Sequence, residues 1–438
     1  MEMRCLSSDE MLRKRAQKRE KKTKKGKNPT WIPIHQLSTA DWKLVFSLFW
    51  GMENIEEKAC LCALNRIFGF EPKKALALIC HIGSAKEVFE LSPSDLEELT
   101  GPYFKYKGKI CWQAAENAAE ELARLERDGI RFCGWTEDSY PALLKECEDA
   151  PIGLYIRSTT PPESLWSKGN CIAVVGTRDI SPYGREWCER IVRGLSGSHQ
   201  KPVIVSGLAL GTDIEAHRTA LENGLPTIGV MATGPDTIYP WRHRQTAEMI
   251  ASTPGCALIS DYPPGTAPLA VHFLRRNRII AGLSKATLLV ESKIRGGGMM
   301  TCRLAFSYNR DVYALPGRVD DVRSQGCNML IRQKIAEPVT SVESLMESLG
   351  MKNVSTGKIS ISDRVSRAFY GKVPEECIGR MLLILEMIQK NRGITLDELS
   401  SASGLGYRLA AEAANLLEIE GLICMDLLQR CSINYKNA

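Results

Sequence analysis

The stretch that decides the fold is CIAVVGTRDISPYG (171–184), in which a short apolar run ends at a glycine turn and passes into a helical pattern. Four more runs of β-branched and small residues end in glycine-containing turns: VIV (203–205), PTIGVM (226–231), ATLLV (286–290) and DVYAL (311–315). Strands that alternate with helices in this way form a parallel sheet covered on both faces, with ligands bound beyond the carboxyl ends of the strands. The pattern predicts an α/β domain built on an extended parallel sheet.

The bulk composition is that of a globular protein with more than one domain. A chain of 438 residues, 44% apolar and 25% charged, is too long for a single ordinary core. We expect no membrane segment and no secretory signal, because no apolar run approaches the roughly 20 residues that span a bilayer. The fifteen cysteines are scattered without metal-ligand spacing, so we expect a reducing, cytoplasmic setting and no metal site.

The net charge of +6 is unevenly distributed along the chain. Residues 11–28 carry ten basic side chains against one acidic side chain, so the remainder is mildly acidic. We expect residues 1–30 to form a basic, disordered tail. A nonspecific contact between this tail and nucleic acid stays open as an alternative.

Four further regions follow the tail. Helix-like apolar spacing predicts a helical domain over 31–128, and the glycine-punctuated sheet predicts an α/β domain over 129–349. A polar stretch predicts a linker over 350–378. Residues 379–438 read as three helices followed by a strand-like run, the order of a winged helix.

The turn after the first strand is a candidate anion site. It carries Arg178, whose planar guanidinium suits phosphate oxygens, and Ser181, which offers a hydroxyl next to a helix start. A surface pair between Arg178 and Asp179 is an equally good interpretation of the residues alone. In the next turn, Gly207 and Gly211 allow a ligand to approach the backbone closely.

A second basic segment lies at a predicted helix start. Arg275, Arg276, Asn277 and Arg278 precede an apolar helix body, and three arginines there should not form a buried face. We expect them to bind phosphates or to coat a solvated rim. Phe273 beside them can stack on a base, although a packed core phenylalanine is the competing interpretation.

The chain has no GxGxxG, no GxxxxGK[ST], no GxSxG and no HExxH motif. We therefore expect no cofactor, no catalytic residue and no enzymatic activity. The alternative is a nucleotide-binding or nucleotide-cleaving enzyme on the same sheet. Its carboxylate would come from Glu291, or from Asp213 with His217, although His217 and Asp213 are more typical of structural roles.

The chain resembles the DNA-processing protein A family (DprA, also called Smf) over about residues 135–330. The residues that carry the resemblance are Tyr140-Pro141, Val175-Gly176-Thr177-Arg178, Tyr183-Gly184, Ser206-Gly207-Leu208-Ala209, Ala216-His217, Tyr239-Pro240, Ser260-Asp261-Tyr262-Pro263-Pro264-Gly265, Phe273 with Arg276-Asn277-Arg278-Ile279-Ile280-Ala281-Gly282, and Pro316-Gly317. Gly296-Gly297-Gly298 departs from the family's usual Ser-Gly-Ser, which removes hydroxyl contacts from that loop.

The resemblance implies a Rossmann-like sheet domain with a helical domain similar to a sterile alpha motif or a helix-hairpin-helix before it, and a winged helix after it. It implies a single-stranded DNA-binding protein that protects incoming DNA during natural transformation (competence) and loads the recombinase RecA, and that forms a homodimer through the sheet domain. It places DNA phosphates at Arg178, the Gly207–Gly211 turn and Arg276–Arg278. In the winged helix, residues 407–421 are acidic, so we expect that domain to contact protein rather than duplex DNA.

Overall fold

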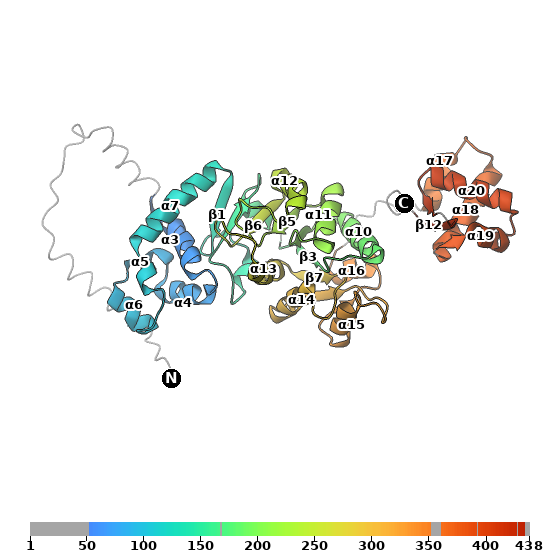
Figure 1. Ribbon diagram of the computed structural model, residues 1–438. Coiled ribbons are helices and arrows are strands. Elements are labelled where there is room, and N and C mark those ends of the chain that lie inside the picture. Colours follow the sequence, from blue (N-terminus) through green and yellow to red (C-terminus); the bar gives the residue numbers. More distant parts are fainter. Residues whose placement is uncertain (1–51, 167–168, 352–360, 392, 427, 434–438) are drawn as a thin grey trace, which may run out of the picture. The chain divides into compact units, whose positions relative to one another are not determined.

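The computed structural model describes residues 52–166, 169–351, 361–391, 393–426 and 428–433 (Figure 1). The basic tail predicted over residues 1–30 lies outside the described residues, as does the first part of the predicted helical domain. Three bodies of secondary structure follow along the chain: a set of helices, a large mixed sheet and a small C-terminal unit.

A nine-stranded sheet runs in the order β1-β2-β6-β5-β4-β3-β7-β8-β9. Its strands are β1 (Ile130–Gly134), β2 (Gly153–Arg157), β3 (Cys171–Val175), β4 (Val203–Ser206), β5 (Thr227–Val230), β6 (Ala257–Ser260), β7 (Ala286–Leu289), β8 (Asp311–Ala314) and β9 (Glu337–Pro338). The strands from β6 to β9 in this order are parallel, whereas β2 joins β6 antiparallel and β1 joins β2 antiparallel. The predicted parallel sheet is confirmed, with an antiparallel extension at one edge.

Both faces of the sheet are covered by helices (Figure 1). Ile172 and Val174 of β3 pack into one apolar cluster, and Ala173 and Val175 pack into another on the opposite face, as expected for a strand buried on both sides. The helices of the first face are α10 (Pro182–Ser196), α11 (Thr212–Glu222) and α16 (Val342–Ser348), and those of the second are α13 (Ala270–Leu283), α14 (Gly297–Ser307) and α15 (Gln325–Arg332). The helix α12 (Arg244–Ser252) contacts β5 and β6.

The helices before the sheet pack against its antiparallel edge. They are α3 (Met52–Phe68), α4 (Pro72–Ile82), α5 (Ala85–Glu90), α6 (Pro93–Thr100) and α7 (Trp112–Arg127). Their apolar side chains share one cluster with Phe132 of β1 and Tyr155 of β2. Asn65 donates a hydrogen bond from Nδ2 to the Asp261 carbonyl at 2.8 Å, which ties α3 to the end of β6.

The C-terminal unit has its own core. Its helices and strands are α17 (Ile361–Phe369), α18 (Glu375–Lys390), α19 (Leu396–Ser403), α20 (Tyr407–Ile419), β10 (Ile394–Thr395), β11 (Ile423–Met425) and β12 (Arg430–Ile433). The linker predicted over 350–378 is wrong at 361–369, because Val365 and Phe369 of α17 are buried in this core. The identification of the unit as a winged helix stays a prediction.

The strand order places a switch point next to β3. From β3 the chain builds β4, β5 and β6 toward one edge, and it then returns to add β7, β8 and β9 on the other side. In open α/β sheets, a crevice forms where the connections leave in opposite directions beyond the carboxyl ends of the strands. The loop that carries Arg178 follows β3 directly, so it lies at this position.

Candidate functional site

The loops that follow β3 and β4 are fastened to each other through their backbones. The backbone N–H of Thr212 donates to the Thr177 carbonyl at 3.1 Å. Gly211 has φ +76°, and a Cβ there would overlap the Thr177 carbonyl, so only glycine fits this approach. Gly211 is half-buried at the start of α11, which places it near Arg178, as the sequence predicted.

Arg178 is exposed at the tip of the loop after β3. Its guanidinium carbon lies 5.6 Å from the centroid of the Phe273 ring, a distance at which a cation interacts with an aromatic face. Within the described residues, Arg178 forms no ion pair with a carboxylate. The neighbouring Asp179 pairs with Arg323 at 2.9 Å. The interpretation of Arg178 as the partner of Asp179 is therefore wrong.

Ser181 caps α10 and does not offer its hydroxyl to solvent. Its Oγ donates to Glu291 Oε1 at 2.5 Å and accepts a hydrogen bond from the Gly184 N–H at 3.0 Å. The backbone N–H of Ser181 donates to Glu291 Oε2 at 2.9 Å. Because both groups are already bonded, the prediction that the Ser181 side chain contacts phosphate has no free donor to support it.

Gly207 and Arg276 form an internal brace under the loop after β4. Arg276 is 3% exposed, and its Nη1 donates to the Gly207 carbonyl at 2.7 Å and also to the Val230 carbonyl. The Gly207 N–H donates to Asp213 Oδ2 at 3.1 Å. Burial lowers the pKa of Arg276 to about 10, while the nearby Asp213 acts in the opposite direction. Both backbone groups of Gly207 are thus occupied, contrary to the expected contact with a ligand.

Asn277 and Arg278 are buried as well. Arg278 is 5% exposed, donates to Asp261 Oδ2 at 2.5 Å and also donates to the Asp149 carbonyl. Asn277 is 8% exposed and accepts from Arg276 Nε at 3.3 Å. The prediction that these side chains lie at an accessible rim is wrong, because both are buried and Arg278 uses its Nη1 and Nη2 donors on acceptors from distant parts of the chain.

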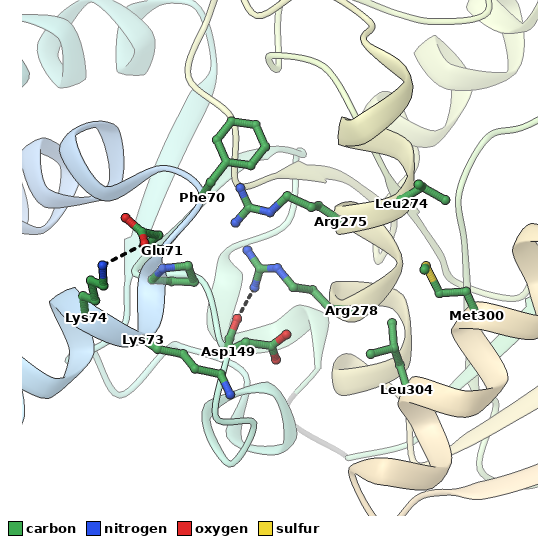
Figure 2. Close-up of a pocket in the computed structure, with 11 residues that line it drawn as sticks. Phe70, Glu71, Lys73, Lys74, Asp149, Leu274, Arg275, Arg278, Met300 and Leu304 are labelled. Carbon is green, nitrogen blue, oxygen red and sulfur yellow. Dashed lines mark hydrogen bonds and ion pairs between the residues drawn. The ribbon is translucent and has the colours of Figure 1, made fainter.

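Arg275 points toward Phe70 in the helical region (Figure 2). Its guanidinium carbon lies 4.2 Å from the Phe70 ring centroid, and its Nη2 donates to the Gly69 carbonyl at 2.9 Å. Together with Arg278 it lines a pocket of about 500 Å³ between α13 and the turn after α3. The structure therefore separates Arg275 from the rim at Arg178, although the two were predicted to act together.

Two aromatic side chains that we did not predict as site residues lie next to this rim. Tyr239 and Trp241 are 49% and 68% exposed in the connection between β5 and α12. The Tyr239 ring lies 5.5 Å from the half-buried Phe273 ring, inclined by 62°. The sequence could have indicated them through two aromatic residues in the glycine-containing connection that follows a strand. Aromatic residues in such a connection are typical neither of a packed core nor of a regular helix.

The carboxylates proposed for an enzymatic alternative are bonded inside the fold. Glu291 is 1% exposed, and its carboxylate accepts a hydrogen bond from the Ser181 hydroxyl. His217 is fully buried, its Nδ1 lies 2.7 Å from Thr227 Oγ1, and burial lowers its pKa to about 3. A neutral, enclosed histidine is consistent with the structural role that the sequence favoured for His217, and that role stays a prediction.

The described ranges contain neither a candidate metal cluster nor a helix that could span a membrane. Over these residues, no group of three or more histidine, cysteine, aspartate or glutamate side chains is arranged to hold a metal ion. No helix in the same part of the chain is both long and apolar enough to cross a bilayer.

Comparison with known proteins identifies the family of this chain. A family model described as DNA recombination-mediator protein A matches residues 131–350. DNA processing protein DprA of Streptococcus pneumoniae is 40% identical over 226 residues, which are 51% of this chain and 77% of that protein. Protein Smf of Synechocystis sp. is 34% identical over 295 residues, 67% of this chain and 73% of its own length.

A solved structure shares the fold. The X-ray structure of DNA processing protein A from Streptococcus pneumoniae superposes with a TM-score of 0.54 and 31% identity, over 67% of this chain and 95% of that chain. The matched region holds the Rossmann-like sheet together with Arg178 and Phe273. The chain therefore belongs to the DNA recombination-mediator protein A family.

Proposed function

We propose that this protein binds single-stranded DNA at a rim formed by Arg178 and Phe273, and that it protects incoming DNA during natural transformation. One observation supports the proposal above all others. Arg178 is exposed, lies against the Phe273 ring and has no carboxylate partner within the described residues. A cation in this state can replace the counterions of a phosphate, and a ring beside it can stack on a base.

The buried polar residues act as positioning residues in this proposal. Arg276 holds the Gly207 carbonyl, and Arg278 holds Asp261 and the Asp149 carbonyl. Together they fix α13, and with α13 the ring of Phe273 at its N-terminal turn. Gly211 allows the loop of Arg178 to pack closely on the next loop, and contact of its backbone with phosphate stays a prediction.

The test is the affinity for a labelled oligo-dT strand, measured by fluorescence anisotropy at low salt. Arg178→Ala should weaken binding about 5- to 50-fold and by the same factor for different sequences, because phosphate contacts carry no sequence information. Arg127→Ala is the matched control, because it removes one exposed arginine from the last turn of α7. Equal affinities of wild type and Arg178→Ala would refute the assignment.

We further propose, on the family resemblance, that the protein loads RecA onto the bound strand and forms a homodimer through its sheet domain. Light scattering of the full chain gives the oligomeric state directly. RecA assembly on strands covered by a single-strand binding protein should accelerate in the presence of this protein. An unchanged rate of assembly would contradict the proposed loading role.

We assign no catalytic step to the site. A nucleotide-cleaving alternative would use Glu291, or Asp213 with His217, and all three side chains are buried and hydrogen-bonded. Incubation of the protein with nucleoside monophosphates should release no free base, while an oligo-dT strand is retained. Release of base would revive the enzymatic alternative.

For the C-terminal unit we propose a contact with another protein. The helix α20 carries Glu412 and Glu418, and Glu420 follows at its end, which disfavours a phosphate groove. Deletion of residues 361–438, which removes the whole C-terminal unit with the predicted winged helix over 379–438, should leave the affinity for oligo-dT unchanged. A loss of duplex binding on this deletion would contradict the proposal.

A further inference from the structure

The connection between β5 and α12 exposes aromatic surface in one place. Trp241 leaves 68% of its surface in solvent, and Tyr239 leaves 49%. Burial of such rings is among the larger apolar contributions to folding, and the fold gains little of it here. Isolated exposed apolar side chains are ordinary on protein surfaces, but these two adjoin the rim that holds Arg178 and Phe273.

Hydrogen bonds hold this connection in position. His243 is buried and its Nδ1 lies 2.8 Å from the Leu208 carbonyl, in the loop after β4. Thr233 Oγ1 donates to the Thr237 carbonyl at 2.5 Å, and Asp236 Oδ1 accepts from the Gly265 N–H at 3.0 Å. A surface that is fixed before binding loses less entropy when a ligand arrives.

A cation accompanies the exposed indole. The guanidinium carbon of Arg244 lies 4.6 Å from the Trp241 ring centroid. Arg242, between the two in the sequence, is exposed as well. Arginine beside a stacking ring is the combination found in grooves that bind single strands.

A series of ring contacts leads from the rim to this connection. The contacts run from Arg178 to Phe273 at 5.6 Å and from Phe273 to Tyr239 at 5.5 Å. Trp241 follows Tyr239 by two residues, so their Cα atoms are at most about 7 Å apart. Contacts therefore join Arg178, Phe273 and Tyr239, and Trp241 with Arg244 follows Tyr239 in the sequence.

We propose that Trp241, backed by Arg244, is a second base-stacking platform, which takes a base of the same single strand beyond the nucleotide held at Arg178 and Phe273. This inference rests on the proposed function. The ligand is a single-stranded nucleic acid that runs along the edge from Arg178 past Tyr239 to Trp241. A protein partner seated on Trp241 is the competing occupant, and the experiment separates the two.

The experiment compares oligo-dT strands of about four and about fifteen nucleotides, lengths that bracket typical single-strand sites. Trp241→Ala should weaken binding of the longer strand about 5- to 100-fold and leave the shorter one within about twofold. Trp241→Phe should recover most of the loss, because a ring remains. Tyr103→Ala is the matched control, since Tyr103 is 97% exposed and lies in the helical region.

A second probe tests stacking itself. A fifteen-nucleotide strand that keeps its phosphates but lacks bases outside its centre should bind wild type and Trp241→Ala equally, because no flanking base remains to stack. Equal binding of the normal strand by wild type and Trp241→Ala, with Arg178→Ala still defective, would overturn the inference alone. A wild-type protein that ignores every strand would overturn the proposed function with it. Thermal unfolding confirms that Trp241→Ala is folded.

Discussion

Two arginine-bearing regions of the same sheet domain differ in whether their guanidinium groups are exposed or buried. Arg178 is exposed, touches the Phe273 ring and has no carboxylate partner among the described residues. Arg276 and Arg278 of α13 are 3% and 5% exposed, and their guanidinium groups donate to carbonyls and to Asp261. The same side chain serves as a ligand group in the first region and as an internal brace in the second.

The difference teaches where a charge can act. An exposed guanidinium stays hydrated until a phosphate displaces the water around it. Its interaction with the phosphate therefore contributes to the free energy of binding. A buried guanidinium has already exchanged water for fixed acceptors inside the protein. Its hydrogen bonds therefore contribute to the stability of the fold and not to binding. Substitutions in the two regions should therefore affect different measurements.

The largest effect is expected at the buried pair. Arg278→Ala leaves Asp261 without its partner, and we expect the free energy of unfolding to fall by about 3–5 kcal/mol. Urea denaturation measures this loss. Arg318→Ala is the control, because Arg318 pairs with Asp320 where both side chains are exposed, and it should cost less than about 1 kcal/mol. Similar losses in the two variants would remove the distinction between the regions.

A pH dependence tests the buried region next. Burial lowers the pKa of His217 from its ordinary value of 6.5 to about 3, so the unfolded chain binds this proton at a higher pH than the folded chain. Stability from His217 is full above about pH 6.5 and is lost as the pH falls toward 3. Relative to His217→Gln, wild type should lose about 1.4 kcal/mol per pH unit between these limits. Parallel stability curves would show that His217 titrates normally.

The smallest effect is expected at Arg323, which pairs with the neighbour of Arg178 in the exposed rim. Arg323→Ala releases Asp179, which adjoins Arg178 in the sequence and can then neutralise it. We expect a two- to threefold loss of affinity for oligo-dT and a change in stability below about 1 kcal/mol. Asp179→Asn in the same chain should restore the affinity. A loss that persists in this double variant would mean that Arg323 itself contacts DNA.

The sheet could be predicted from the sequence because its signal is local. The predicted run 171–175 is β3 to the residue, and 286–290 and 311–315 each exceed their strands by one. The turn after the predicted run 203–205 carries Gly211, the glycine that close packing against the Thr177 carbonyl requires. The pairing of β2 with β6 could not be inferred in this way, because it joins residues about a hundred positions apart.

The candidate site was predictable only in part. Arg178 and Phe273 were both identified, and the structure brings them together. The burial of Arg278 could not be predicted, because one of its acceptors, the Asp149 carbonyl, lies 129 residues away. Trp241 was missed because an exposed aromatic residue has no periodic pattern, and it became a candidate only because it follows Tyr239, whose ring contacts Phe273, by two residues.

The salt dependence of binding tests the central claim most directly. For wild type, the logarithm of the association constant for oligo-dT should fall linearly with the logarithm of salt concentration, with a slope of about −0.7 per phosphate neutralised. Arg178→Ala should reduce the steepness by close to one such contact, whereas Arg127→Ala should leave it unchanged. An identical slope for wild type and Arg178→Ala would contradict the account.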